Sequence, residues 1–200
     1  MSPSPDAAPF TVFLDRDGVF NVDPQHAGGW PLQIRKPSQF TWQPGAREAF
    51  ARLNRPDVQT CLATNQPGTA LGLSTKGMIR RLHTWMQGEL AAAGGRLDQV
   101  QACFAPPGLP HRRRKPRGGM LADGAAAFPA FDPERAVMIG DKVRDAGAAA
   151  DFGIPAVLVA TSRSEAELRA GAEAKGYPLA AVVPGLPEAV DWVLDRLPND

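Results

Sequence analysis

Cysteine is scarce in this sequence, which excludes one common way of stabilising a small protein. The 200 residues include two cysteines, Cys61 and Cys103, and both lie inside apolar runs. Two thiols do not make the disulfide framework typical of small secreted domains, so a reducing compartment is the simpler interpretation. We therefore expect a cytoplasmic protein whose fold depends on its hydrophobic core.

Net charge is low, and long apolar runs are missing. The 22 basic and 21 acidic side chains leave a formal net charge of +1, so the chain as a whole is not built to bind nucleic acid or an anionic membrane. No apolar run approaches the roughly 18 residues that a membrane-spanning helix needs. We expect no nucleic-acid partner and no membrane association.

The first residues lack the features of a targeting sequence. The stretch MSPSPDAAP contains no basic residue and no apolar core, so a signal peptide is not expected. We interpret residues 1–9 as a short disordered lead-in. Residues 10–200 are long enough to bury a core, and we expect them to fold as a single domain and to act as a monomer.

Short apolar runs alternate with amphipathic segments along the chain. The predicted strands cover residues 10–15, 58–65, 100–105, 136–141 and 155–161, with a possible edge strand at 181–183. Predicted helices cover residues 44–53, 74–93, 120–128 and 145–152, followed by a Glu- and Ala-rich helix and a last helix at 188–197. Ser74 is the expected N-cap of the second helix. This alternation predicts an α/β fold, a Rossmann-like three-layer sandwich with a mostly parallel central sheet.

Three predicted strands end in polar residues. Asp15 follows the first strand, Thr64 and Asn65 end the second, and Asp141 ends the fourth. Ligands of open parallel sheets bind beyond the carboxyl ends of the strands, where the strand order reverses. We therefore expect the chemistry of this protein at these strand ends.

Acidic residues gather at two of these ends. The segment LDRDG places Asp15 and Asp17 two residues apart, and GDKVRD adds Asp141 and Asp145. Two carboxylates about 4 Å apart repel by about 4 kcal/mol at an effective dielectric constant near 20, so something must neutralise them. Oxygen ligands suit a hard cation, which predicts a magnesium site.

A phosphate ester is the substrate that best fits a metal among carboxylates. The metal would remove the repulsion between the ester and the acidic side chains. Thr64 offers a hydroxyl, the backbone after it offers N–H groups, and Lys115 offers a positive charge. Hydrolysis through a covalent carboxyl-phosphate divides a very slow reaction into two easier steps. Asp15 would attack, and Asp17 would first protonate the leaving alkoxide and then deprotonate water.

Four segments, taken in order, resemble the signature motifs of the haloacid dehalogenase (HAD) superfamily. They read DRDGVFN, ATNQPG, RKPRGGML and MIGDKVRD, and the similarity runs from about Phe10 to Thr161. The likeness is greatest to the capless branch that contains heptose-bisphosphate and histidinol-phosphate phosphatases. The resemblance implies a HAD-like fold with no large cap domain and a phosphatase that depends on Mg²⁺.

The resemblance also implies a role for each matching residue. By this similarity Asp15 is the nucleophile, Asp17 is the general acid/base and binds Mg²⁺ through its backbone carbonyl, and Asp141 is the third protein ligand. By the same similarity, Thr64 and Asn65 hold the phosphoryl group, and Lys115 neutralises its charge. Arg114 matches an arginine that recognises the substrate. Lys142 lies beside the metal, and Asp145 orders the loop.

The sequence departs from the family in one loop. Many relatives bind a structural zinc there through a Cys-x-His pair and a later Cys-x-Cys pair. Here Cys103 stands in the first ligand position and Ala105 replaces the histidine, while His111 and Arg113 replace the later cysteines. Tetrahedral zinc needs four ligands, so we expect no structural zinc.

Several functions remain open to this set of residues. The best interpretation is a phosphatase of a small phosphorylated metabolite, with the 7-phosphate of D-glycero-D-manno-heptose 1,7-bisphosphate as first choice and histidinol phosphate as the alternative. A nucleic-acid 3′-phosphatase could use the run HRRRKPR as a groove, but the near-zero net charge disfavours it. A phospho-acceptor signalling domain would carry its acidic pair on adjacent residues, whereas Asp15 and Asp17 are spaced by one.

Overall fold

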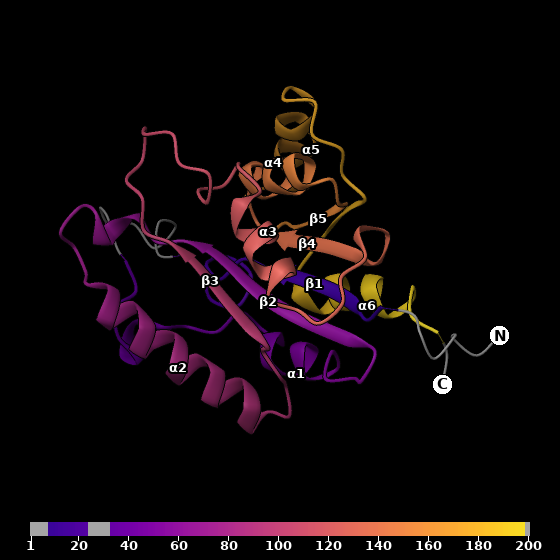
Figure 1. Cartoon of the computed structure of the whole chain (residues 1–200), viewed down its shortest axis with the longest axis horizontal. Coiled ribbons are helices and arrows are strands. Elements are labelled where there is room, and N and C mark those ends of the chain that lie inside the picture. The colour runs from indigo at the N-terminus through magenta and orange to yellow at the C-terminus, as the bar shows by residue number, and fades with distance from the viewer. Residues whose placement is uncertain (1–7, 24–32, 199–200) are drawn as a thin grey trace.

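The computed structural model describes residues 8–23 and 33–198, so most of the predicted lead-in lies outside the described residues. Its centre is a six-stranded sheet in the order β3-β2-β1-β4-β5-β6, and every neighbouring pair is parallel (Figure 1). The strands are β1 (Phe10–Leu14), β2 (Val58–Asn65), β3 (Gln99–Cys103), β4 (Ala136–Gly140), β5 (Ala156–Val159) and β6 (Ala181–Val183).

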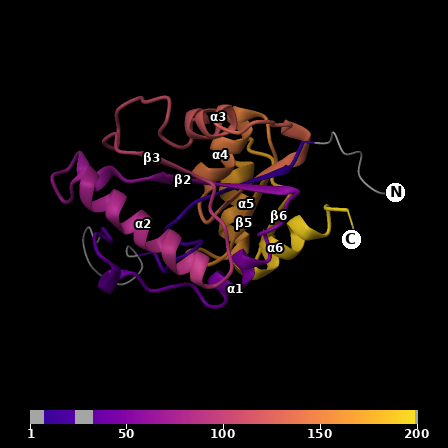
Figure 2. The same ribbon diagram turned by 60° about the horizontal axis from the view of Figure 1, so that its bottom comes forward.

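Helices cover both faces of the sheet. One face carries α1 (Ala46–Ala51), α2 (Lys76–Ala92) and α6 (Leu186–Leu194), and the other carries α3 (Gly119–Ala126), α4 (Val143–Phe152) and α5 (Glu165–Glu173) (Figure 2). Short 3₁₀ turns lie at Pro37–Gln39, Pro67–Thr69 and Pro133–Arg135. This arrangement confirms the predicted three-layer α/β sandwich, and the comparisons below bear out the absence of a large cap.

Strand residues point alternately into two hydrophobic cores. In β1, Val12 and Leu14 pack on the side of α1, α2 and α6, while Phe13 packs on the side of α3 and α4. All residues of β1, β2, β4 and β5 are buried. A strand covered on both faces reads as a continuous apolar run, which is why these segments could be recognised in the sequence.

The start of α2 differs from the prediction. Thr75, not Ser74, is the N-cap, since Thr75 has an extended backbone and its Oγ1 accepts a 3.1 Å hydrogen bond from the N–H of Met78. Ser74 instead shares a 3.1 Å hydrogen bond with Thr69. The prediction for Ser74 is therefore wrong by one residue, because two adjacent hydroxyl side chains can both cap and only the backbone conformation decides between them.

The strand order places the predicted site at a switch point. From β1 the chain proceeds to β2 and β3 on one side, then returns to β4, β5 and β6 on the other. The order thus reverses between β1 and β4, and Asp15 and Asp141 follow these two strands. None of the described helices is long and apolar enough to cross a membrane.

Candidate active site

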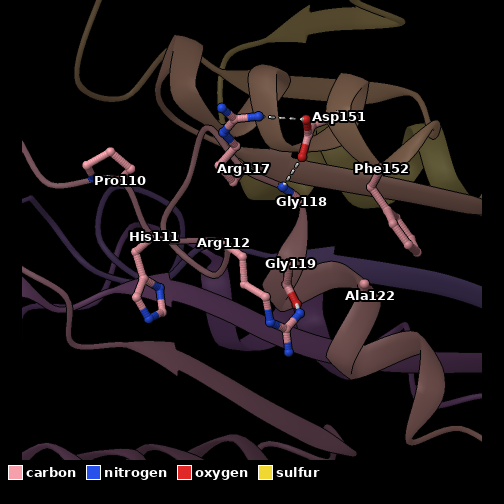
Figure 3. A pocket seen from close by; sticks show the side chains of 9 residues that line it. All are labelled: Pro110, His111, Arg112, Arg117, Gly118, Gly119, Ala122, Asp151 and Phe152. Carbon is pink, nitrogen blue, oxygen red and sulfur yellow. Dashed lines mark hydrogen bonds and ion pairs between the residues drawn. The ribbon is translucent and has the colours of Figure 1, made fainter.

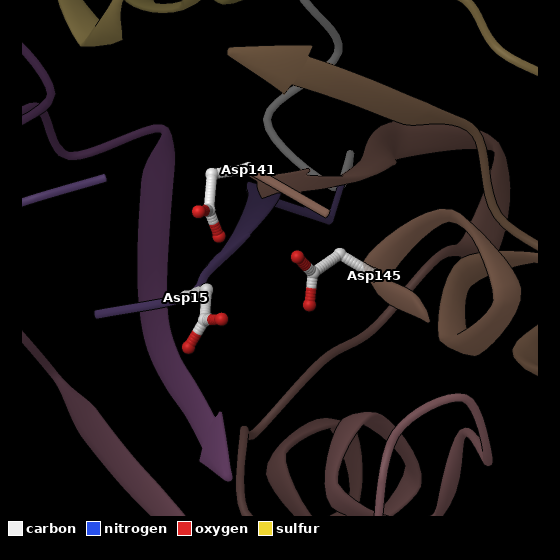
Figure 4. Close-up of side chains that lie close together, drawn as sticks. All are labelled: Asp15, Asp141 and Asp145. Atoms are coloured by element: carbon white, nitrogen blue, oxygen red, sulfur yellow. The ribbon is translucent and has the colours of Figure 1, made fainter. Parts of the chain in front are cut away.

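Three buried carboxylates meet at the carboxyl end of the sheet. Asp15 follows β1, Asp141 follows β4, and Asp145 lies in the first turn of α4. One oxygen from each lies within 4.8 Å of the others, and the side chains point toward a common space (Figure 4). We call these residues the carboxylate cluster. Asp15 and Asp141 are therefore close enough to share one ion, as the sequence predicts.

Two glycines leave room for this cluster. Gly18 has a left-handed φ of 89°, and a Cβ at this position would overlap the carboxylate of Asp141. A Cβ at Gly140 would overlap the side chain of Asp145. The backbone can approach the acidic side chains this closely only where no side chain intervenes.

Lys115 supplies the positive charge at the centre of the cluster. Its Nζ lies 2.9 Å from Oδ2 of Asp15 and 2.6 Å from Oδ1 of Asp145, and it donates a 2.7 Å hydrogen bond to the carbonyl of Ala63. The Lys115 side chain is fully buried. A buried charge must be paired, and here both pairing groups belong to the predicted site.

Asn65 lies beside Lys115 and fixes its backbone. The Asn65 side chain donates to the carbonyl of Lys115 and accepts from the Lys115 N–H, with both hydrogen bonds at 3.2 Å. Thr64 precedes it in β2, and its hydroxyl accepts a 3.0 Å hydrogen bond from Gln66. The structure thus brings Thr64, Asn65 and Lys115 to the same end of the sheet as the carboxylate cluster.

The cations around Asp15 favour its ionised form. Burial alone would raise the pKa of the Asp15 carboxyl, but Lys115, Arg144 and Lys142 outweigh burial and hold this pKa below its ordinary value. An ionised carboxylate is the form that can attack phosphorus.

The surroundings of Asp141 shift its pKa in the opposite direction to that of Asp15. Burial, together with the nearby carboxylates of Asp145 and Asp15, raises the pKa of Asp141 to about 7, although Lys142 acts against this rise. Its Oδ2 accepts hydrogen bonds from Lys142 at 2.7 Å and from Ser162 at 2.5 Å. Its buried Oδ1 has no hydrogen-bond partner among the described residues. An unsatisfied carboxylate oxygen facing other carboxylates fits the donor set of Mg²⁺.

Asp17 is not part of the carboxylate cluster and has its own set of partners. Its carboxylate accepts hydrogen bonds from Arg16, Asn21 and Gln66, at 3.0 to 3.2 Å. Burial would raise the pKa of Asp17, but Arg16 and the hydrogen bond from Asn21 lower it overall, against a smaller opposing effect of Asp15. Asp17 also lines the neighbouring cavity.

A cavity of about 220 Å³ opens next to Asp17. Its lining includes four more of the predicted or neighbouring polar residues: Asn65, Arg114, Lys142 and Arg144. Arg114 donates a 3.1 Å hydrogen bond to the carbonyl of Ala105, and burial together with the nearby positive charge of Arg144 lowers the pKa of Arg114. The cavity is thus a polar pocket with cations on its wall.

Sequence reasoning missed several residues of this site. Arg144 lines the cavity, and the only signal for it was its place inside GDKVRD. Asp23 lies 2.6 Å from the ammonium of Lys142, although the two are 119 residues apart. Arg16 and Gln66 contact Asp17 from two different segments. Contacts of this kind depend on packing that no local pattern reveals.

A larger groove of about 500 Å³ lies elsewhere, beside α3 and α4 (Figure 3). Two arginines on its wall are already paired: Arg112 contacts Asp123 at 2.5 Å, and Arg117 contacts Asp151 at 3.8 Å. None of the predicted site residues lines this groove, whereas Asp17, Asn65 and Lys142 line the smaller cavity. The smaller cavity, not this groove, adjoins the predicted chemistry.

The loop expected to lack zinc is held by other contacts. We call residues 104–114 the arginine loop. The Cys103 thiol lies 3.7 Å from Nδ1 of His111, while Arg113 donates to Gln101 at 2.7 Å and pairs with Asp123 at 3.1 Å. Ala105 offers no ligand atom, so these positions supply at most two of the four that zinc needs. The residues present do not fit a structural zinc, and its absence stays a prediction.

Comparisons with known proteins agree with this geometry. A HAD-hydrolase-like family model matches residues 112–189. A D-glycero-beta-D-manno-heptose-1,7-bisphosphate 7-phosphatase of Rhodopseudomonas palustris is 35% identical over 157 residues, which cover 72% of this chain and 79% of the relative. A D-glycero-D-manno-heptose-1,7-bisphosphate 7-phosphatase of Thermosynechococcus vestitus is 34% identical over 93% of this chain and 96% of its own.

A solved structure supports the same family. The crystal structure of D,D-heptose 1,7-bisphosphate phosphatase from B. bronchiseptica, complexed with magnesium and phosphate, superimposes with a TM-score of 0.80 at 31% identity. The match covers 94% of this chain and 99% of that one. The resemblance noted in the sequence is therefore confirmed. The chain belongs to the HAD superfamily and, within it, to the heptose-1,7-bisphosphate 7-phosphatase family of phosphoric monoester hydrolases.

Proposed function

We propose that this protein is a Mg²⁺-dependent phosphatase that removes the 7-phosphate of D-glycero-D-manno-heptose 1,7-bisphosphate through an aspartyl-phosphate on Asp15. One observation carries the proposal. Oxygens of Asp15, Asp141 and Asp145 lie within 4.8 Å of one another, beside a buried lysine and a cation-lined cavity. The relatives that carry this activity in their names are similar over most of the chain.

The residues divide into those that hold the metal and those that hold the substrate. Asp15, Asp141 and the backbone carbonyl of Asp17 would hold Mg²⁺, which when bound neutralises charge and draws the phosphoryl oxygens toward the nucleophile. Thr64 and Lys115 would contact the transferred phosphoryl group, and the 2.9 Å contact of Lys115 with Asp15 supports this role. Lys142 and Asp145 support the arrangement through their ion pairs with Asp141 and Lys115.

The proposed reaction has two steps, transfer of the phosphoryl group to Asp15 and hydrolysis of the phosphoenzyme. In the first step a carboxylate oxygen of Asp15 attacks phosphorus, the bond between phosphorus and the sugar oxygen breaks, and that oxygen receives a proton that Asp17 has taken up from solvent. In the second step Asp17 takes a proton from water as the water oxygen attacks phosphorus. The bond between phosphorus and Asp15 then breaks, which restores the carboxylate and releases inorganic phosphate.

The cavity favours a substrate with a second anionic group. Arg114 and Arg144 both line it, and they are close enough for the charge of one to lower the pKa of the other. Burial would lower the pKa of Arg144, but the carboxylates of Asp145, Asp15 and Asp141 raise it, so its charge is already compensated. Arg114 is the guanidinium that would bind a second anionic group. A bisphosphate supplies that anion at the end of the sugar opposite to the reacting phosphate.

Steady-state kinetics on a small panel tests this function. The panel contains both anomers of the heptose bisphosphate, histidinol phosphate and a DNA oligonucleotide with a 3′-phosphate, each with Mg²⁺ and with EDTA. We expect the bisphosphate to give the highest kcat/KM, to release one phosphate and to keep its 1-phosphate. Faster turnover of histidinol phosphate, or equal activity in EDTA, contradicts the proposal. A phosphoenzyme that persists for minutes without substrate would instead indicate a signalling domain.

The proposal includes a monomer in the cytoplasm. Both cysteines are unpaired and buried, which agrees with a reducing compartment. Light scattering coupled to size-exclusion chromatography, at low and high salt, measures the mass directly. A species of about 21.3 kDa supports the monomer, and a mass twice as large contradicts it.

A further inference from the structure

Arg16 is the least expected residue of the site. It stands between the two acidic residues of DRDG, yet its side chain is fully buried. A guanidinium is always charged, so every buried N–H group needs an acceptor. Asp17 receives hydrogen bonds from Nε and Nη2 of Arg16 at 3.0 to 3.2 Å, and Nη2 also donates to Gln66 at 3.1 Å.

The remaining nitrogen of Arg16 faces α2. Its Nη1 lies 3.2 Å from Nε2 of His83, a residue 67 positions later in the chain. His83 is buried, with 4% of its surface exposed. Because a guanidinium only donates, Nε2 of His83 must accept, so the ring is neutral and carries its proton on Nδ1. Burial and the charge of Arg16 agree with this, since they lower the pKa of His83 to about 3.

We propose that His83 is a positioning residue for catalysis: it holds the Arg16 guanidinium, which in turn orients the carboxyl group of Asp17 toward the cavity. This inference rests on the proposed function, because it gives Asp17 the acid/base role. The hydrogen bonds form one continuous path from His83 through Arg16 to Asp17. Gln66 joins Arg16 to Asp17 a second time, because it accepts a hydrogen bond from Arg16 and donates one of 3.1 Å to Asp17.

The neutrality of His83 matters for this role. A carboxylate at position 83 would compete with Asp17 for the same guanidinium and weaken the contact that orients the acid/base. An apolar side chain would leave Nη1 of Arg16 buried without an acceptor, and the guanidinium would shift to find one. A neutral acceptor satisfies the hydrogen-bonding needs of Nη1, and the ion pair between Arg16 and Asp17 then has no competing carboxylate.

The test compares two kinds of phosphate ester. The alkoxide of a sugar phosphate needs a proton from Asp17 in order to leave, whereas p-nitrophenolate leaves without one. The value of kcat/KM covers the steps up to loss of the leaving group, so it isolates the first proton transfer. A change that only reduces the amount of folded enzyme lowers kcat/KM for both esters equally, and the ratio of the two values stays constant.

The variants are His83→Leu, which removes the acceptor, and His83→Gln, which keeps one. We expect His83→Leu to lower kcat/KM for the heptose bisphosphate about tenfold and that for p-nitrophenyl phosphate much less, with His83→Gln close to wild type. Should His83→Leu fail to fold, His83→Asn replaces it, since its shorter amide does not reach Nη1 of Arg16. Met86→Ala, a buried change in the same helix, is the control for lost stability.

The results separate this inference from the proposed function. Equal losses for the two esters in His83→Leu or His83→Asn, or no loss in either, overturn the role of His83. The same conclusion follows if His83→Gln is as impaired as His83→Leu. Wild-type enzyme that does not hydrolyse the heptose bisphosphate overturns the proposed substrate instead, and the comparison then proceeds with any sugar phosphate that the wild type hydrolyses.

Discussion

Two regions of this molecule contain similar ion pairs in different surroundings. At the end of the sheet, Lys115 contacts Asp15 and Asp145 at 2.9 and 2.6 Å with all three side chains buried. In the arginine loop, Arg112 and Arg113 contact Asp123 at 2.5 and 3.1 Å, with 66% and 31% of the arginine side chains exposed. The distances are alike, so burial sets the difference in energy and function.

The comparison predicts where substitutions have large effects. Breaking a buried pair leaves an uncompensated charge, which typically costs about 3–5 kcal/mol, whereas an exposed pair contributes about 0–1 kcal/mol. No structural zinc is expected in the arginine loop, and side-chain contacts of Cys103 with His111 and of Arg113 with Gln101 hold it instead. Their strength decides how well the loop is held.

The largest expected effect comes from Asp15→Asn. The amide has nearly the same shape but cannot form the covalent phosphate, so turnover is lost while the fold remains. Phosphate release and circular dichroism measure the two properties. More than trace activity in purified Asp15→Asn would show that the buried cluster does not act through this carboxylate.

Asp17→Asn comes next. The variant still carries the nucleophile but lacks the acid/base, so kcat falls about 10²–10⁴-fold and some phosphoenzyme accumulates. Intact-protein mass spectrometry after rapid quenching detects the added phosphoryl group. If no adduct is trapped under any condition, the assignment of Asp17 to the second step is weakened.

Lys115→Met tests the buried pair directly. Removing this ammonium leaves the carboxylate cluster without its central cation, so we expect about 3–5 kcal/mol lower stability and an activity loss of at least about 10²-fold. Urea unfolding with and without Mg²⁺ measures the stability. Mg²⁺ should recover part of the loss, since it supplies positive charge to the same carboxylates. An unchanged unfolding midpoint would show that the buried ion pairs of Lys115 stabilise the fold no more than the exposed pairs of the arginine loop.

Arg113→Met, in the arginine loop, is the counterpart of Lys115→Met, and we expect it to have the smallest effect. It removes contacts with Gln101 and Asp123, both partly exposed, so stability falls by about 1 kcal/mol or less. KM rises modestly, because the loop ends at Arg114 and is followed directly by Lys115. A stability loss equal to that of Lys115→Met would show that the loop pairs are as strong as the buried ones.

The sequence was sufficient to locate the centre of the site. Asp15 and Asp141 follow apolar runs, and parallel strands bring their carboxyl ends to one edge, so their proximity could be predicted without coordinates. Strand β2 was predicted to the residue, because Val58–Asn65 contains apolar and β-branched residues and is bounded by turn-forming residues. Lys115 could be proposed as the source of positive charge, but its partners Asp15 and Asp145 could not be read from its local sequence.

The contacts between distant segments could not be predicted. Neither the burial of His83 on α2 nor its contact with Arg16 could be predicted, because both depend on the angle at which α2 crosses the sheet. The pairing of Asp23 with Lys142 joins a loop to the start of α4 in the same way. A single sequence specifies local periodicity much better than it specifies which surfaces meet.

The glycines at positions 18 and 140 show that this edge of the sheet is limited by volume as much as by charge. Each of them leaves space that an acidic side chain already occupies. One added methyl group at position 18 or 140 would therefore displace the carboxylate of Asp141, a proposed metal ligand, or that of Asp145, a partner of Lys115, without altering any reacting group. Variants found here by chance would be inactive with every ionisable residue intact, so inactivity in this family need not mean a lost nucleophile, acid or ligand.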